Sequence, residues 1–106
     1  MQVFRIAIPA SRIDVSRAFY EAVFAMAADD RVPSRLYFHC GDVIVAVIDW
    51  AVEGRGAFHA TPEDLYFSTG ELDAVHDRAV AAGARVTCLC FVDETTLFLG
   101  RGAAWS

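Results

Sequence analysis

Residues 3–8 alternate between two faces, with Phe4, Ile6 and Ile8 on one and Val3, Arg5 and Ala7 on the other, and apolar residues then recur at helical spacing. Strict alternation predicts a half-buried strand, and Arg5 lies on its more polar face. Pro9 has no backbone N–H to donate, so we expect the strand to end there. From Val15 the apolar residues follow the i, i+3, i+4, i+7 spacing of an amphipathic helix. Asp14, which precedes it, is a good N-cap for that helix.

The segment after this helix has room for three strands. Residues 31–33 are predicted to form a turn or a short edge strand. Residues 36–40 and 43–49 are apolar strands, and the Gly41-Asp42 pair between them has the favoured chemistry of a two-residue hairpin turn. Residues 50–62 then form a loop.

The same pattern then starts a second time. Ile6-Ala7-Ile8 corresponds to Leu65-Tyr66-Phe67, and Ile13-Asp14 corresponds to Leu72-Asp73. Asp73 caps the second predicted helix, and Gly83 ends it. A repeat of this length argues for two stacked βαβββ-like modules with a site between them. We expect an α+β fold, in which a curved mixed sheet forms a cleft and carries helices on its outer face.

The second copy is shorter than the first. Residues 84–93 form one predicted strand without a turn, and residues 96–99 form a short apolar anchor. Module two therefore lacks a strand and a hairpin, either by natural deletion between Thr87 and Cys88 or because the molecule has residues there that the printed sequence lacks. The predicted organisation is a single domain, residues 1–106. Its parts are module one over about 1–52, a linker over about 53–62 and module two over about 63–100.

Composition and charge narrow the range of partners. The 106 residues are 56% hydrophobic, enough for one compact domain with a core. Fourteen acidic residues against nine basic ones give a net charge of −5, which makes nucleic acid a poor partner. An acidic surface attracts cationic small molecules, or it serves solubility alone.

We also expect the protein to be cytoplasmic. The longest aliphatic run, Val43 to Ile48, is too short to cross a bilayer, and the N-terminus lacks the layout of a signal peptide. Cys40, Cys88 and Cys90 are an odd number of cysteines in apolar strand patterns, which favours reduced thiols. The Cys88-x-Cys90 pair lacks the spacing of a strong zinc site.

Three segments suggest a family. Arg5-Ile-Ala-Ile-Pro-Ala with Ala18-Phe-Tyr-Glu-Ala-Val, Asp64-Leu-Tyr-Phe-Ser with Glu71-Leu-Asp-Ala-Val, and Cys90-Phe-Val-Asp-Glu follow one another in order. Together they resemble the vicinal oxygen chelate superfamily, which includes glyoxalase I, bleomycin-resistance proteins and extradiol dioxygenases. The resemblance covers roughly residues 3 to 99.

The resemblance implies a divalent metal held by His or Glu side chains on the inner face of the strands. The matching positions here are Arg5, Asp64 and Cys90. Arginine is a permanent donor and cannot be a ligand, and one carboxylate with one thiol is a poor donor set. We therefore expect no cofactor, with a divalent metal as the disfavoured alternative. An ion pair between Arg5 and Asp64 across the cleft would take the place of the metal, either as a ligand anchor or as a buried salt bridge.

Aromatic residues lie at strand positions that point toward the same cleft. Tyr37, His39 and Tyr66 are in predicted strands, and Trp50 lies at the rim. They are candidates for ligand binding together with Arg5, Asp64 and Cys90, and core packing is the alternative for each. His39 is a candidate general base, but no acid, nucleophile or metal is identified beside it.

Three functions stay open at this point. The first is a small-molecule-binding protein without the family metal that sequesters an aromatic or cationic ligand. The second is a metal-dependent lyase or dioxygenase. The third is an assembly-only domain whose sheet face is used in dimer contacts. A homodimer is expected in any case, because the predicted modules leave a sheet edge and a concave face that need cover.

Overall fold

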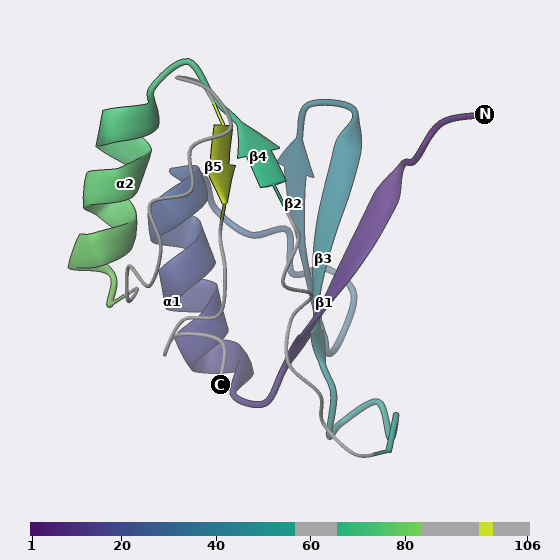
Figure 1. The fold of residues 1–106 in the computed structure, drawn as a ribbon. Coiled ribbons are helices and arrows are strands. Elements are labelled where there is room, and N and C mark those ends of the chain that lie inside the picture. Colours follow the sequence, from purple (N-terminus) through teal and green to yellow (C-terminus); the bar gives the residue numbers. More distant parts are fainter. Residues whose placement is uncertain (57–65, 84–95, 99–106) are drawn as a thin grey trace.

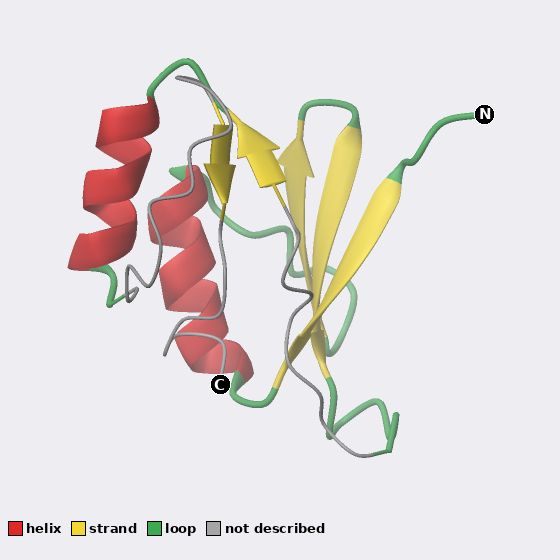
Figure 2. Cartoon of the chain, in the orientation of Figure 1, coloured by secondary structure: helices red, strands yellow, loops and turns green. Residues whose placement is uncertain are grey.

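A computed structural model describes residues 1–56, 66–83 and 96–98 of the chain (Figure 1). The elements follow in this order: β1 (Arg5–Ala10), α1 (Ile13–Phe24), β2 (Arg35–Cys40), β3 (Val43–Asp49), β4 (Tyr66–Ser68), α2 (Leu72–Ala81) and β5 (Thr96–Phe98). The predicted α+β class is confirmed, and both helices lie on the same side of the three-stranded sheet (Figure 2).

The main sheet is mixed and has the order β1-β3-β2. β1 pairs with β3 in parallel, and β2 pairs with β3 in antiparallel fashion. Cys40 pairs with Val43, so Gly41-Asp42 forms the predicted two-residue turn, with Gly41 at a φ of +61°. β4 and β5 form a separate antiparallel pair.

The core lies between one face of this sheet and α1. Alternation sends Ile8, Val45, Val47 and Phe38 toward the helix, and each is at most 1% exposed. From α1, the rings of Phe19 and Tyr20 and the side chain of Val23 complete the core. Phe24 extends the core toward β4, because its ring centroid is 5.2 Å from that of Phe38 and 5.4 Å from that of Phe67.

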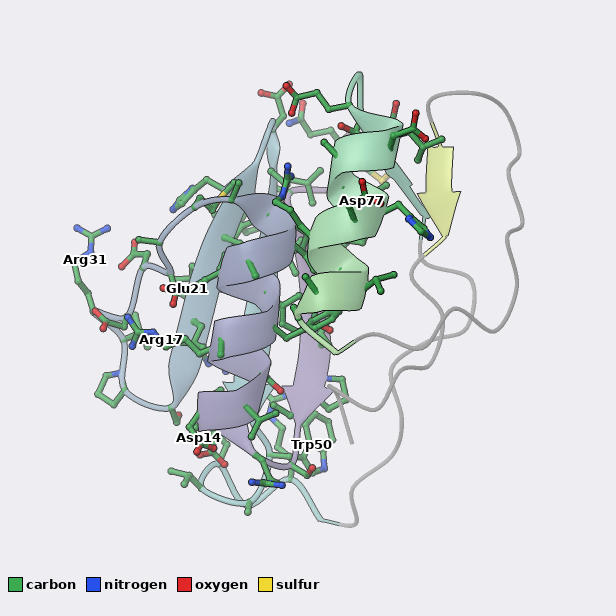
Figure 3. All side chains as sticks on the ribbon, turned by 90° about the vertical axis from the view of Figure 1, so that its left-hand side faces the viewer. Asp14, Arg17, Glu21, Arg31, Trp50 and Asp77 are labelled. Atoms are coloured by element: carbon green, nitrogen blue, oxygen red, sulfur yellow. The ribbon has the colours of Figure 1, made fainter. Side chains whose placement is uncertain are left out.

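The second helix packs on the first. Ala79 of α2 is buried in the same core. The Arg78 guanidinium donates to the backbone oxygens of Ala22 (3.2 Å) and Val23 (3.1 Å), which satisfies carbonyls at the C-terminus of α1. On the other flank of α1, Arg17 pairs with Glu21 at 3.5 Å and with Asp30 of the following loop at 3.1 Å (Figure 3).

The structure corrects the predicted end of β1. The strand continues through Pro9, which pairs in register with Ile48, and ends at Ala10. β1 is at the edge of the sheet. The Phe4 carbonyl accepts a bond from Ile44 of β3, and the Ala10 carbonyl accepts one from Trp50 just after β3, so alternation turns the Pro9 nitrogen to the other edge. A proline at that position removes no ladder hydrogen bond.

Of the described elements, two strands, β2 and β3, directly follow α1. Of the two alternatives predicted for residues 31–33, the structure shows the turn, in which the Arg35 amide donates to the Val32 carbonyl at 3.3 Å. An isolated bridge joins Asp29 to Tyr37 ahead of this turn. The two backbone bonds of that bridge are both 2.9 Å.

Both predicted N-caps were also wrong. Arg12 and Glu71 are the N-cap residues, neither makes a side-chain capping bond, and Asp14 and Asp73 lie in the first turns. A carboxylate in the first turn still interacts favourably with the helix dipole. Gly83 follows the C-cap of α2 at a φ of +102°, as predicted. The strand expected over residues 84–93 lies outside the described residues. The prediction that module two lacks a strand and a hairpin therefore stays a prediction.

Truncation of Phe38, which is 0% exposed, should lower the free energy of unfolding by about 3–5 kcal/mol in the Phe38→Ala variant. The matched control is Val52→Ala, because Val52 is 71% exposed and its truncation should change stability by less than about 0.5 kcal/mol. Urea unfolding monitored by circular dichroism measures both. Equal losses in the two variants would contradict this description of the core.

Candidate functional site

Strand alternation brings three of the predicted site residues to one face of the sheet. In the pairing register, Arg5 is level with Ile44 and His39, and Ala46 lies between Ala7 and Tyr37 in the next row. These rows point away from α1, since successive residues of a strand point to opposite faces. We call this surface the helix-free face: residues 5, 7 and 9 of β1, 35, 37 and 39 of β2, and 44, 46 and 48 of β3.

Arg5 lies over two aromatic rings, that of Tyr37 on the helix-free face and that of Phe4, the residue before it. Its guanidinium carbon is 4.9 Å from the ring centroid of Tyr37 and 5.3 Å from that of Phe4, which is cation–π geometry. Arg5 is in the row of Ile44 and Tyr37 is in the row of Ala46, so the guanidinium reaches the ring diagonally across β3. Among the described residues, no carboxylate forms an ion pair with Arg5.

A second polar network lies farther along the same face. Arg35 donates to both carboxylate oxygens of Glu53, at 2.8 and 3.0 Å, and the Ser34 hydroxyl donates to Glu53 at 2.9 Å. The pKa of Arg35 is raised, first by Glu53 and then by the Tyr37 hydroxyl. The same contacts, with Arg35 first and Ser34 second, lower the pKa of Glu53 to about 2. Tyr37 is thus flanked by two arginines, one over its ring and one at its hydroxyl.

His39 lies at the outer edge of the helix-free face. Its side chain is 61% exposed, and its Nε2 is 3.7 Å from the nearer carboxylate oxygen of Asp29. Arg31 holds that carboxylate through two hydrogen bonds of 2.9 and 2.7 Å and keeps the pKa of Asp29 well below its ordinary value. These contacts explain the position of His39 without assigning it a proton-transfer role.

The remaining predicted site residues are not gathered beside Arg5. Trp50 follows the far end of β3, six residues beyond the partner of Arg5, or roughly 20 Å at about 3.3 Å per residue. There the Arg55 guanidinium lies 5.4 Å from its ring centroid. Tyr66 begins β4, but its side chain, Asp64 and Cys90 lie outside the described residues. The expected meeting of Arg5 and Asp64 stays a prediction.

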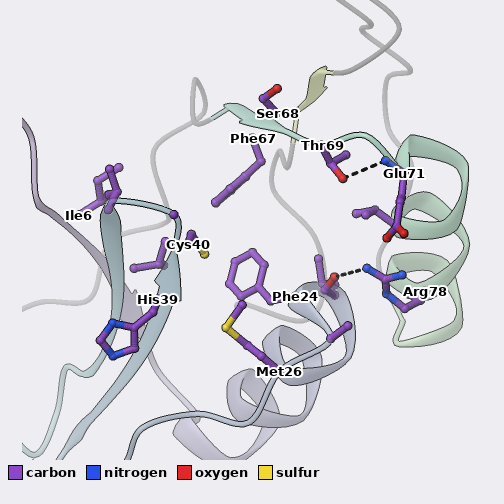
Figure 4. A pocket seen from close by; sticks show the side chains of 16 residues that line it. Ile6, Phe24, Met26, His39, Cys40, Phe67, Ser68, Thr69, Glu71 and Arg78 are labelled. Atoms are coloured by element: carbon purple, nitrogen blue, oxygen red, sulfur yellow. Dashed lines mark hydrogen bonds between the residues drawn. The ribbon is translucent and has the colours of Figure 1, made fainter.

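Sequence reasoning missed a cavity on the opposite, helix-covered side. It has a volume of about 570 Å³ and lies between the β2–β3 hairpin, the end of α1, β4 and α2 (Figure 4). Phe24, Met26, Cys40 and Phe67 contribute to its wall, and Arg78 lies at its α2 side. Burial raises the pKa of the Cys40 thiol. The sequence gives no signal for this space, because it depends on the spacing between α1 and β4.

Of the three expected metal-ligand positions, the structure describes only Arg5, which cannot be a ligand. Within residues 1–56 and 66–83 no group of three or more His, Cys, Asp or Glu side chains is arranged to hold an ion. Arg5, at the first expected ligand position, is a cation stacked on Tyr37 and has no lone pair to offer.

Comparison with known proteins gives one match. The family model of the Glyoxalase/Bleomycin resistance protein/Dioxygenase superfamily matches residues 2–88. The match ends before Cys90 and the expected closing strand. No curated protein and no solved structure matches the chain. In the part of the chain that the structure describes, no helix is both long and apolar enough to cross a membrane.

The Glu53 contacts predict a pH dependence of stability. Because folding lowers the pKa of Glu53 from 4.5 to about 2, its contribution is fully present above pH 4.5 and is lost as the pH falls toward 2. The stability difference between wild type and Glu53→Gln should therefore be constant near neutral pH and shrink below about pH 4. Glu71→Gln is the control, because no described residue pairs with that carboxylate. If the stability difference between wild type and Glu53→Gln were the same at every pH, the ionic contribution of Glu53 would be ruled out.

Proposed function

Because the chain belongs to the Glyoxalase/Bleomycin resistance protein/Dioxygenase superfamily, we propose that it binds a small aromatic molecule on the helix-free face. The ligand is sequestered without chemical change and without the metal ion of the family's enzymes. We place the protein in the cytoplasm, where thiols such as the unpaired Cys40 stay reduced.

One observation carries this proposal: the Arg5 guanidinium, stacked 4.9 Å from the Tyr37 ring centroid, has no carboxylate partner among the described residues. Its donors are therefore available to a ligand, and a guanidinium binds a carboxylate through two parallel hydrogen bonds. The exposed Phe4 ring on its other side adds apolar surface. An aromatic molecule with an anionic group matches this combination.

A cationic ligand, the other chemistry expected from the acidic composition, is less well supported. The carboxylate of Glu53 is already shared by Arg35 and Arg55, and that of Asp29 is held by Arg31. A ligand cation near Tyr37 would also be repelled by Arg5.

A metal-dependent lyase or dioxygenase is the competing function. That function requires metal-coordinating side chains other than Arg5, supplied by residues outside the described part of the chain. A stoichiometric divalent ion that survives dialysis of freshly purified protein would replace our proposal with this one.

We also propose a homodimer. β1 is an edge strand of the main sheet, and Phe4 and Val3 beside it are 60% and 65% exposed. Unpaired strand edges and exposed aromatics are commonly covered by a partner. If the dimer contact consumed the helix-free face, the protein would be an assembly domain rather than a binder.

The ligand prediction is tested with a matched pair of indoles. Indole-3-carboxylate should raise the melting temperature of the wild type, whereas tryptamine, its cationic counterpart, should not. Arg5→Met should weaken binding of the carboxylate by about tenfold or more. Arg55→Met is the control, because Arg55 makes the same kind of cation–π contact with Trp50, at the far end of the face. Equal losses in the two variants, or unchanged binding in Arg5→Met, would refute the role of Arg5.

The dimer prediction is tested by size exclusion with light scattering. The wild type should elute with the mass of two chains at micromolar concentration, and Phe4→Asp should shift the population toward one chain. Val52→Asp serves as the control, because Val52 is equally exposed but lies in the loop after β3. A wild type with the mass of one chain would contradict the prediction.

A further inference from the structure

The cavity on the helix side arises because α1 is shorter than the sheet it covers. Its 12 residues span about 18 Å, whereas the seven residues of β3 span about 23 Å. α1 ends at Phe24, and its C-cap residue Ala25, with a φ of +53°, turns the chain away before the β2–β3 hairpin is reached. α1 therefore does not cover the hairpin end of the sheet, and β4 and α2 close the space there.

The walls of the cavity are apolar and polarisable. Phe24 and Phe67 form an aromatic wall, with their ring centroids 5.4 Å apart, and Met26 and Cys40 bring sulfur atoms to the same space (Figure 4). Val43 and Val45 of β3 form part of the floor. A volume of about 570 Å³ lies within the range of small-molecule pockets. Rings and sulfur atoms together favour a flat aromatic ligand.

One side of the cavity offers a fixed hydrogen-bond donor. Two nitrogens of Arg78, Nε and Nη2, are held by the carbonyls of Ala22 and Val23. Its third nitrogen, Nη1, makes no hydrogen bond to any residue that the structure describes. Because the first two bonds fix the guanidinium, the remaining donor is positioned before a ligand arrives.

The charge at this rim favours a neutral ligand. The Glu71 carboxylate borders the cavity on the same side as Arg78, so the two charges offset each other (Figure 4). A ligand anion would meet Glu71 and a ligand cation would meet Arg78. A neutral oxygen, in contrast, accepts from Arg78 at no such cost.

We infer that this cavity is a second binding site, which takes a neutral aromatic molecule carrying one carbonyl or hydroxyl oxygen. The ring packs against Phe24, Phe67 and Met26, and the oxygen accepts a hydrogen bond from Arg78. The site is borne mainly by the helix-covered side and includes neither Arg5 nor Tyr37; His39 of the helix-free face also borders it, at the hairpin end. The inference does not depend on the proposed function.

The two methionines of the chain allow a direct test, because Met26 borders the cavity and Met1 is fully exposed. Protein labelled with ¹³C at the methionine methyl groups is titrated with 1-tetralone. The Met26 methyl signal should move in a saturable manner under the ring current of the ligand, and the Met1 signal should stay in place. Tetralin, which lacks the carbonyl, should bind about tenfold more weakly.

Two variants assign the contacts. Arg78→Lys should bind tetralin like the wild type but lose the preference for 1-tetralone. Arg5→Met should leave the Met26 response unchanged, which separates this site from the one on the helix-free face. The inference is overturned if Met26 does not respond in the folded wild type, if both methionines respond alike, or if Arg5→Met abolishes the response.

Discussion

The seating of α1 on one face of the three-stranded sheet is the constraint on which the rest of the structure depends. Phe19 and Tyr20 are buried against strand residues such as Phe38, so that face is committed to the core. The other face is thereby left to Arg5 and Tyr37. α2 is attached to α1 rather than to the sheet, through Ala79 and the Arg78 bonds to the last carbonyls of the helix. Both proposed sites follow from this arrangement.

Much of the fold was predictable, because it is encoded in short-range patterns. Apolar runs located β2 and β3, and the chemistry of Gly41 and Gly83 located a hairpin and a helix end. The failures came from tertiary context. Pro9 remains in β1 because its nitrogen faces the sheet edge, a fact that depends on which strand β1 pairs with.

The candidate site was likewise predictable only in part. Periodicity shows that Arg5 and Tyr37 occupy strands, and the register then places them on one face. Their stacking could not be predicted, because it is a diagonal contact between two rows of the sheet and depends on the register of three strands. The separation of Trp50 from Arg5 and the cavity beside Met26 also depend on distances between elements, which no local pattern encodes. The family match supports the predicted fold class. The presence of Arg5 at a position where the family is expected to carry a metal ligand concerns the chemistry of the site instead.

The central claim is that the helix-free face replaces a metal site with an arginine stacked on a tyrosine. A crystal structure of the protein with indole-3-carboxylate tests it most directly. Our account predicts the indole ring beside Tyr37 and its carboxylate within hydrogen-bonding distance of the Arg5 guanidinium, on the face opposite α1. A divalent ion held on that face, or an Arg5 side chain already paired with a carboxylate of the protein, would contradict it.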